Sequence, residues 1–174
     1  MADFSIISDV SNEVLKLLRE NICPELIQSP ESIALAAPTD KNADFQLGLY
    51  LYDIQELREY QQQDMIRLRG NMTQYPPKPL TLYFALYMNT KSQLMSNVEN
   101  EQRILGRAIQ VLMDHAILYD TGEDEDTSAS ITLLPLSYEE KTKIWSVLSI
   151  PYQLGIYFSV SPVLLSSRRK IGRA

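Results

Sequence analysis

Large aliphatic or phenylalanine side chains occupy every second position over residues 80–88, and this alternation restricts the fold more than any other feature of the sequence. The apolar positions are Leu80, Leu82, Phe84, Leu86 and Met88, and the positions between them hold Thr81, Tyr83, Ala85 and Tyr87. Because successive side chains of a strand point to opposite faces, the pattern predicts a β-strand. Residues 45–54 alternate in the same way, with leucines on one face and tyrosines on the other. The chain is therefore built around two long strands, each buried on at least one face.

Shorter strands and three helices are predicted around this pair. Further strands are expected over residues 32–38, 131–136 and 154–164. Apolar residues at helical spacing predict helices over residues 6–20 and 97–118, and a third between Ser137 and Pro151. Together these elements predict an α+β fold, in which about three helices pack on a mixed, mainly antiparallel sheet. With 174 residues and no internal repeat or linker, the chain is expected to form a single domain over residues 1–174.

The ends of the predicted helices carry recognisable signals. Asp9 or Ser11 is expected to cap the first helix, so its start is left open between them. Ser137 stands three residues before Glu140, which is the pattern of a capping box at the start of the third helix.

Three polar segments separate the predicted elements. Residues 56–75 are rich in charged and amide side chains, and we expect an exposed, extended excursion between two strands. The proline-rich residues 75–79 are expected to be a rigid lead-in to the next strand, with a ligand for a proline-binding module as the alternative. The acidic residues 122–126 lack the ligand spacing of a calcium loop and predict a solvated loop.

The composition argues against most catalytic and metal sites. The chain has one cysteine, Cys23, and one histidine, His115, whereas zinc sites usually recruit several such ligands. His115 is expected on the helix over residues 97–118, and no local signature pairs it with Cys23. Neither a phosphate-binding glycine loop nor a nucleophile elbow occurs. We therefore predict no enzyme activity, no catalytic residue, no cofactor and no metal.

Charge and targeting signals limit the environment of the protein. The net charge of −6 argues against general nucleic-acid binding, which needs a basic surface. No apolar run is long enough to span a bilayer, and Asp3 stands where a signal peptide would carry basic residues. A single cysteine forms no intramolecular disulfide, which fits folding in the cytoplasm. The last seven residues nevertheless carry +4, so a basic tail begins at about residue 166.

Four segments, taken in their order and spacing, carry a resemblance to a known family. They are residues 47–53 (LGLYLYD), 77–87 (PKPLTLYFALY), 101–112 (E-x-x-ILGRA-x-QVL) and 151–158 (PYQLGIYF). In that order they resemble the cap, or tail-terminator, proteins of extracellular contractile injection systems. These systems are phage-tail-like particles built from an inner tube, a contractile sheath and a baseplate. The resemblance covers roughly residues 5–165.

The resemblance implies a structural function and a phage tail-terminator-like fold. A homohexameric ring at the end distal to the baseplate would end tube growth and anchor the last sheath ring. The implied partners are other copies of the chain, sheath subunits and inner tube subunits. The implied place of assembly is the cytoplasm, within a particle that can leave the cell.

A cap needs surfaces on which neighbours can build, and two segments offer them: the polar excursion and the C-terminal strand with its basic tail. The candidate partner-binding residues are Arg58, Arg67, Arg69, Tyr75, Arg168, Arg169, Lys170 and Arg173. The alternatives are a solvated loop for the excursion and plain disorder for the tail.

Other functions remain open at this point. A tail-completion or adaptor subunit of a related machine would have the same architecture and a different neighbour. A small-ligand-binding enzyme would need a polar pocket, for example against Arg103 and Arg107. A monomeric regulatory adaptor is the remaining alternative.

Overall fold

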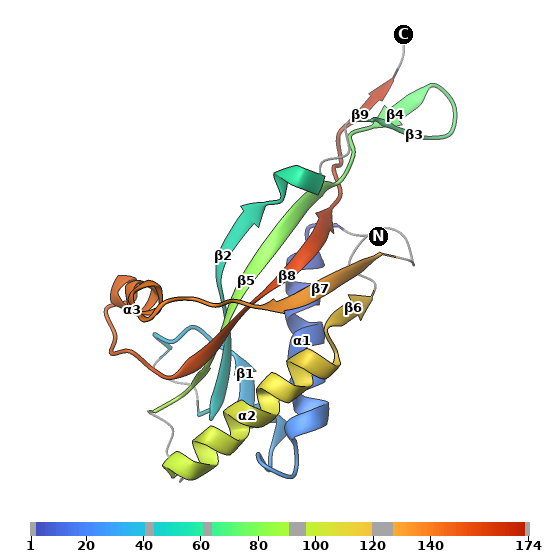
Figure 1. Ribbon diagram of the computed structural model, residues 1–174. Helices are drawn as coiled ribbons and strands as arrows, with labels where there is room; N and C mark the ends of the chain where they lie inside the picture. The colour runs from blue at the N-terminus through green and yellow to red at the C-terminus, as the bar shows by residue number, and fades with distance from the viewer. Residues whose placement is uncertain (1–2, 41–43, 61–63, 91–96, 120–126, 173–174) are drawn as a thin grey trace.

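The computed structural model describes residues 3–40, 44–60, 64–90, 97–119 and 127–172. The molecule is elongated, with a large sheet and three helices in its body and a small sheet extending from one end (Figure 1). The helices are α1 (Ile6–Ile22), α2 (Val98–Asp114) and α3 (Tyr138–Val147), and the 3-10 turns are η1 (Pro30–Ser32) and η2 (Arg58–Tyr60).

Six strands form the body sheet in the spatial order β1-β2-β5-β8-β7-β6. They are β1 (Ile33–Leu35), β2 (Leu47–Glu56), β5 (Lys78–Met88), β6 (Ile117–Tyr119), β7 (Ser128–Leu133) and β8 (Gly155–Leu165). β1 is parallel to β2, and the other neighbouring pairs are antiparallel. The predicted α+β fold with a mixed, mainly antiparallel sheet is thus confirmed.

Helices α1 and α2 cover one face of this sheet. Their apolar stripes pack on the alternating residues that predicted β5, and Leu82, Phe84 and Leu86 are completely buried there. The rings of Phe84 and Phe158 stack across neighbouring strands with their centroids 5.3 Å apart. Burying a leucine or phenylalanine side chain stabilises a fold by about 1.5–3 kcal/mol, so this face supplies most of the core.

Helix α3 packs on the opposite face of the sheet through Trp145, the only one of its ten residues that is fully buried. The indole meets the Tyr87 ring edge-on at 5.6 Å, and its Nε1 donates a hydrogen bond of 2.7 Å to the Tyr157 hydroxyl. Space for this cluster depends on Gly48, where an added Cβ would lie 2.4 Å from the Tyr87 ring. The Lys141 ammonium, 5.5 Å from the centre of the Tyr157 ring, and the Tyr138 ring, 5.2 Å from that of Tyr152, add to this attachment. The second sheet face is therefore covered at one end by a helix whose most deeply buried contact is Trp145.

The second helix is shorter than predicted. The helix expected over residues 97–118 ends at Asp114, and His115 leaves the helical conformation with φ −118° and ψ 46°. Ile117–Tyr119 instead form β6, which pairs with β7. Leu118, in this strand, is buried in the core. The apolar residues therefore continue past the end of the helix at a spacing that also fits a helix.

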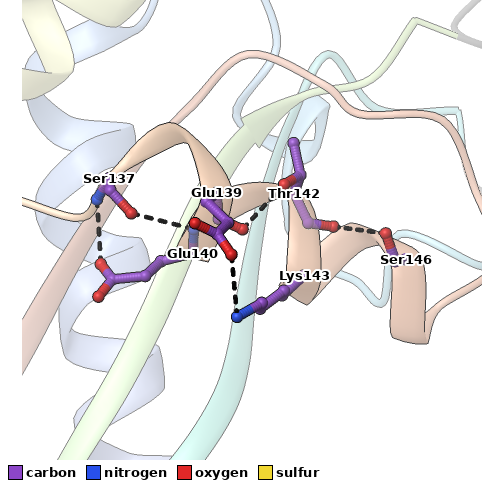
Figure 2. A network of polar contacts seen from close by, with 6 residues as sticks. All are labelled: Ser137, Glu139, Glu140, Thr142, Lys143 and Ser146. Atoms are coloured by element: carbon purple, nitrogen blue, oxygen red, sulfur yellow. Dashed lines mark hydrogen bonds and ion pairs between the residues drawn. The ribbon is translucent and has the colours of Figure 1, made fainter.

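The expected cap of the first helix is also wrong, whereas that of the third is confirmed. Helix α1 begins at Ile6 with Ser5 at its N-cap, and Asp9 instead accepts a hydrogen bond from the Ser5 hydroxyl. Ser11 donates to the Ile7 carbonyl within the helix. At α3, the Ser137 hydroxyl accepts from the Glu140 amide and the Glu140 carboxylate accepts from the Ser137 amide (Figure 2).

Two further expectations concern the segment before α3. The strand expected over residues 131–136 lies earlier, at Ser128–Leu133. The Leu134 amide still donates to the Tyr157 carbonyl, but Pro135 has no amide hydrogen with which to continue the pairing. The acidic residues 122–126 lie outside the described part of the chain. In the described ranges, no helix has the length and apolar character needed to cross a bilayer.

Replacing Trp145 with alanine tests how α3 is held. Trp145→Ala removes a fully buried aromatic side chain, and we expect a loss of about 3–5 kcal/mol in the free energy of unfolding. Val147→Ala is the matched control on the same helix, because Val147 is 84% exposed and should change stability by less than about 0.5 kcal/mol. Urea denaturation followed by far-UV circular dichroism measures both. Equal losses for the two variants would contradict the role of Trp145.

Candidate functional site

The small sheet at one end of the molecule, which we call the arm, consists of residues 65–75 and 166–172. It contains β3 (Ile66–Arg67), β4 (Met72–Gln74) and β9 (Lys170–Gly172) in the order β3-β4-β9. β4 leads into β5, and β9 follows β8, so the arm continues the two central strands of the body (Figure 1). Segments that lie about 100 residues apart in the sequence thus form one surface.

A tight turn joins β3 to β4. Gly70 lies in this turn with φ +79°, a conformation that side chains other than glycine rarely adopt. The Leu68 amide donates to the Met72 carbonyl at 2.9 Å and closes the turn. The turn therefore gives residues 64–75, expected as an extended excursion, the form of a hairpin.

Backbone pairing attaches β9 to this hairpin. Thr73 is the register partner of Ile171, and the Tyr75 amide donates to the Arg169 carbonyl at 3.3 Å. The Arg169 guanidinium lies 4.9 Å from the centre of the Tyr75 ring, within cation–π range. The Gln74 side chain also donates to the Ser167 carbonyl. These contacts give the basic tail a fixed partner within its own chain.

The N-terminal residues hold the base of the arm. Arg168 makes a bidentate contact with Asp3, through Nη2 at 2.5 Å and Nε at 3.2 Å, and its guanidinium lies 5.6 Å from the Phe4 ring centre. The hydrogen bond from Arg168 lowers the pKa of Asp3. The carboxylate is therefore charged at neutral pH, and the contact is lost only as the pH falls through that lowered pKa.

The arm carries charge of one sign. Residues 65–75 and 166–172 include five basic and no acidic residues, so the remaining 156 residues carry −11. Arg67, Arg69 and Lys170 are exposed, and among the described residues no ion pair involves them. The arm therefore presents a basic surface on an otherwise acidic molecule, which suits it to attract an acidic protein surface.

Most of the predicted partner-binding residues meet on the arm. Its strands and base hold Arg67, Arg69, Tyr75, Arg168, Arg169 and Lys170. Arg58 lies outside the arm, in η2 after the end of β2, and Arg173 lies outside the described residues. Sequence reasoning missed Asp3 and Phe4, although the acidic and aromatic pair at the N-terminus was visible as a possible partner for the basic tail.

The histidine and the cysteine lie at helix ends. His115 follows the last residue of α2, where its Nδ1 lies 3.2 Å from the Val111 carbonyl. Cys23 follows α1, and burial raises the pKa of its thiol. Over the described ranges, no group of three or more His, Cys, Asp or Glu side chains could hold a metal ion.

Known proteins resemble this chain in sequence pattern and in fold. The sequence model of one family, described as the Pvc16 N-terminal domain, matches residues 9–174. No curated protein matches the chain. The fold resembles the sheath/tube terminator of the PVC extracellular contractile injection system in its extended state, with a TM-score of 0.63 and 16% identity. It also resembles the tube-terminating cap of the anti-feeding prophage, with a TM-score of 0.62 and 15% identity.

The two structural matches cover this chain almost completely. They span 94% and 96% of it, but only 57% and 58% of the terminator and cap chains. The phage tail-terminator-like fold expected from the sequence is thereby confirmed, and the chain spans less than three fifths of the length of these relatives.

Replacing Asp3 with asparagine tests the contact between the N-terminus and the arm. Asp3→Asn removes the charge that Arg168 binds, and we expect the backbone amides of β4 and β9 to exchange with solvent roughly two- to fivefold faster, as for other exposed ion pairs. Glu13→Gln is the control, since Glu13 lies exposed on α1. Hydrogen–deuterium exchange measures both variants, and an unchanged rate in the arm of Asp3→Asn would refute the contact.

Proposed function

Because the chain belongs to the Pvc16 N-terminal domain family, we propose that it is a structural cap of a contractile injection particle. A ring of six copies at the distal end would stop growth of the inner tube and anchor the last sheath ring. The single observation that carries this proposal is the fold, which a sheath/tube terminator and a tube-terminating cap share over more than nine tenths of this chain. In this function residues 1–174 act as one domain.

The partners follow from the same proposal. The PVC structure is described as a sheath/tube terminator and the anti-feeding prophage structure as a tube-terminating cap. Tube and sheath subunits are therefore the partners we propose, in addition to other copies of the chain. Assembly would take place in the cytoplasm, before the particle leaves the cell.

The basic arm supports docking as the mode of action. It projects from the body (Figure 1) and carries its cations on a framework fixed by backbone pairing and by the Asp3 contact. Binding a protein surface through prearranged strands costs less conformational entropy than ordering a free tail. The residues we propose for partner binding are Arg58, Arg67, Arg69, Tyr75, Arg168, Arg169, Lys170 and Arg173.

A non-catalytic role fits the polar contacts of the described residues. The network on α3 consists of the capping box, two bonds from the Thr142 and Ser146 hydroxyls to carbonyls of the same helix, and one ion pair between Glu139 and Lys143, so all its contacts lie within the helix and its cap (Figure 2). Arg103 pairs with Glu99 within α2, and Arg107 donates to the Asn21 carbonyl of α1, so both arginines make structural contacts. We therefore propose that the protein is not an enzyme.

Deleting the gene tests the proposed function. Without a cap, tube and sheath lack a stop, and we expect particles of variable length whose sheaths detach or contract early. Negative-stain electron microscopy of purified particles measures the length distribution and the state of the sheath. Restoring the gene should restore a uniform length, whereas uniform, intact particles in the deletion strain would overturn the proposal.

Reversing charge on the arm tests its role in docking. Arg67→Glu with Arg69→Glu places like charges against an acidic partner, and we expect roughly a tenfold or larger fall in the fraction of capped particles. Lys16→Glu with Arg103→Glu changes the net charge equally on the helices and serves as the control. Equal capping by both double variants would show that the arm is not the docking surface.

A further inference from the structure

A groove beside α3 offers a second unpartnered surface on the body. It measures ≈ 360 Å³ and lies between α3 and β2, with Tyr50, Tyr52 and Asp53 on the strand side. The helix side is apolar and consists of Ile144, Val147 and Leu148. Helix α3 leaves this groove open because only Trp145 reaches fully into the sheet.

The groove combines an apolar floor, aromatic rings and one carboxylate. Val147 is 84% exposed at its rim. Asp53 accepts from the Ile54 amide and the Gln55 side chain, and no ion pair to it is found among the described residues. Lys143 also borders the groove, but Glu139 offsets its charge at 3.4 Å. Such a surface suits a guanidinium next to an aliphatic side chain.

The arm presents that combination on one of its faces. Arg67 and Ile171 are both register partners of Thr73, in β3 and β9, so the three side chains share a face of the small sheet. Ile171 is 41% exposed, and Arg67 is exposed on the other side of Thr73. The hollow at the base of the arm is lined by Gln74 and Lys170, which belong to the other face.

The charge distribution favours a second copy of the chain as the occupant. The arm carries +5 and the rest of the chain −11, so the arm of one copy is attracted to the body of another. The arm and α3 lie at separate places in the molecule (Figure 1), so the contact is heterologous, with different patches meeting. A heterologous contact repeated by rotation is what builds a ring.

We propose that the Arg67–Thr73–Ile171 face of one arm docks into the α3 groove of the neighbouring copy. Arg67 then lies against Asp53 and the tyrosine rings, and Ile171 covers the apolar helix side of the groove at Val147. This inference rests on the proposed cap and names the partner of its arm. It leaves tube and sheath to bind other surfaces of the ring.

Chemical cross-linking within assembled particles tests the contact. Cys23→Ser supplies a background without cysteine, in which Ile171→Cys and Val147→Cys place one thiol on the arm and one at the groove. A short bis-maleimide should link copies carrying both changes into a ladder of dimers and longer chains on a denaturing gel. Co-expressing the two single variants should give dimers and nothing longer, because each chain then carries one thiol and can be linked to only one neighbour.

The controls separate this inference from the proposed function. Ile171→Cys with Met113→Cys moves the second thiol to an exposed site on α2 and should give monomers only. Particles that are uniformly capped but yield monomers from the arm–groove pair would overturn the docking and leave the cap function standing. If the cysteine variants are linked, and the deletion strain nevertheless makes particles of unchanged length, the contact is supported and the cap function is overturned.

Discussion

The antiparallel pairing of β5 with β8 determines most of this structure. They are the two central strands of the body sheet, and their pairing runs from Tyr87 opposite Gly155 to Lys78 opposite Leu165. Because the strands run in opposite directions, the segment before β5 and the segment after β8 leave the body at the same end. They pair there once more as β4 and β9, so the arm is a consequence of how the core is paired.

The elements of the body could be predicted because each has a local periodic pattern. Alternation predicted β2, β5 and β8, and apolar stripes predicted α1 and α2. The arm could be predicted only as two polar segments, since the pairing of Thr73 with Ile171 spans almost 100 residues and has no local signal. β9 has three residues, two of them Lys170 and Gly172, so neither alternation nor strand propensity reveals it. The end of α2 was missed because the strand that follows it also buries an apolar side chain.

Helix α3 shows a different limit of sequence reasoning. Its capping box fixes where it starts, and Pro151 marks where it has ended, so its existence was predictable. The side of the sheet that α3 covers is determined by the contacts of Trp145 with Tyr87 and Tyr157. These two tyrosines belong to β5 and β8, which are neighbours only in the folded sheet. Because Trp145 is the only residue of α3 that is fully buried, much of the helix surface stays available, and the groove lies beside it.

The arm is joined to the body by two short segments that lie outside the strands, residues 75–77 before β5 and residues 166–169 after β8. β2 carries Tyr50 and Asp53 and pairs with β5, and β5 leads back into β4 of the arm. Arg169 stacks on Tyr75 and Gln74 donates to the Ser167 carbonyl across this junction, and Asp3 binds Arg168 there, so side-chain contacts hold the arm against the body. A heterologous contact closes into a ring only when each copy repeats the same rotation, and grows into an open filament otherwise. The contacts that hold the junction of arm and body therefore serve closure, whereas an arm on a flexible linker would permit chains of irregular geometry.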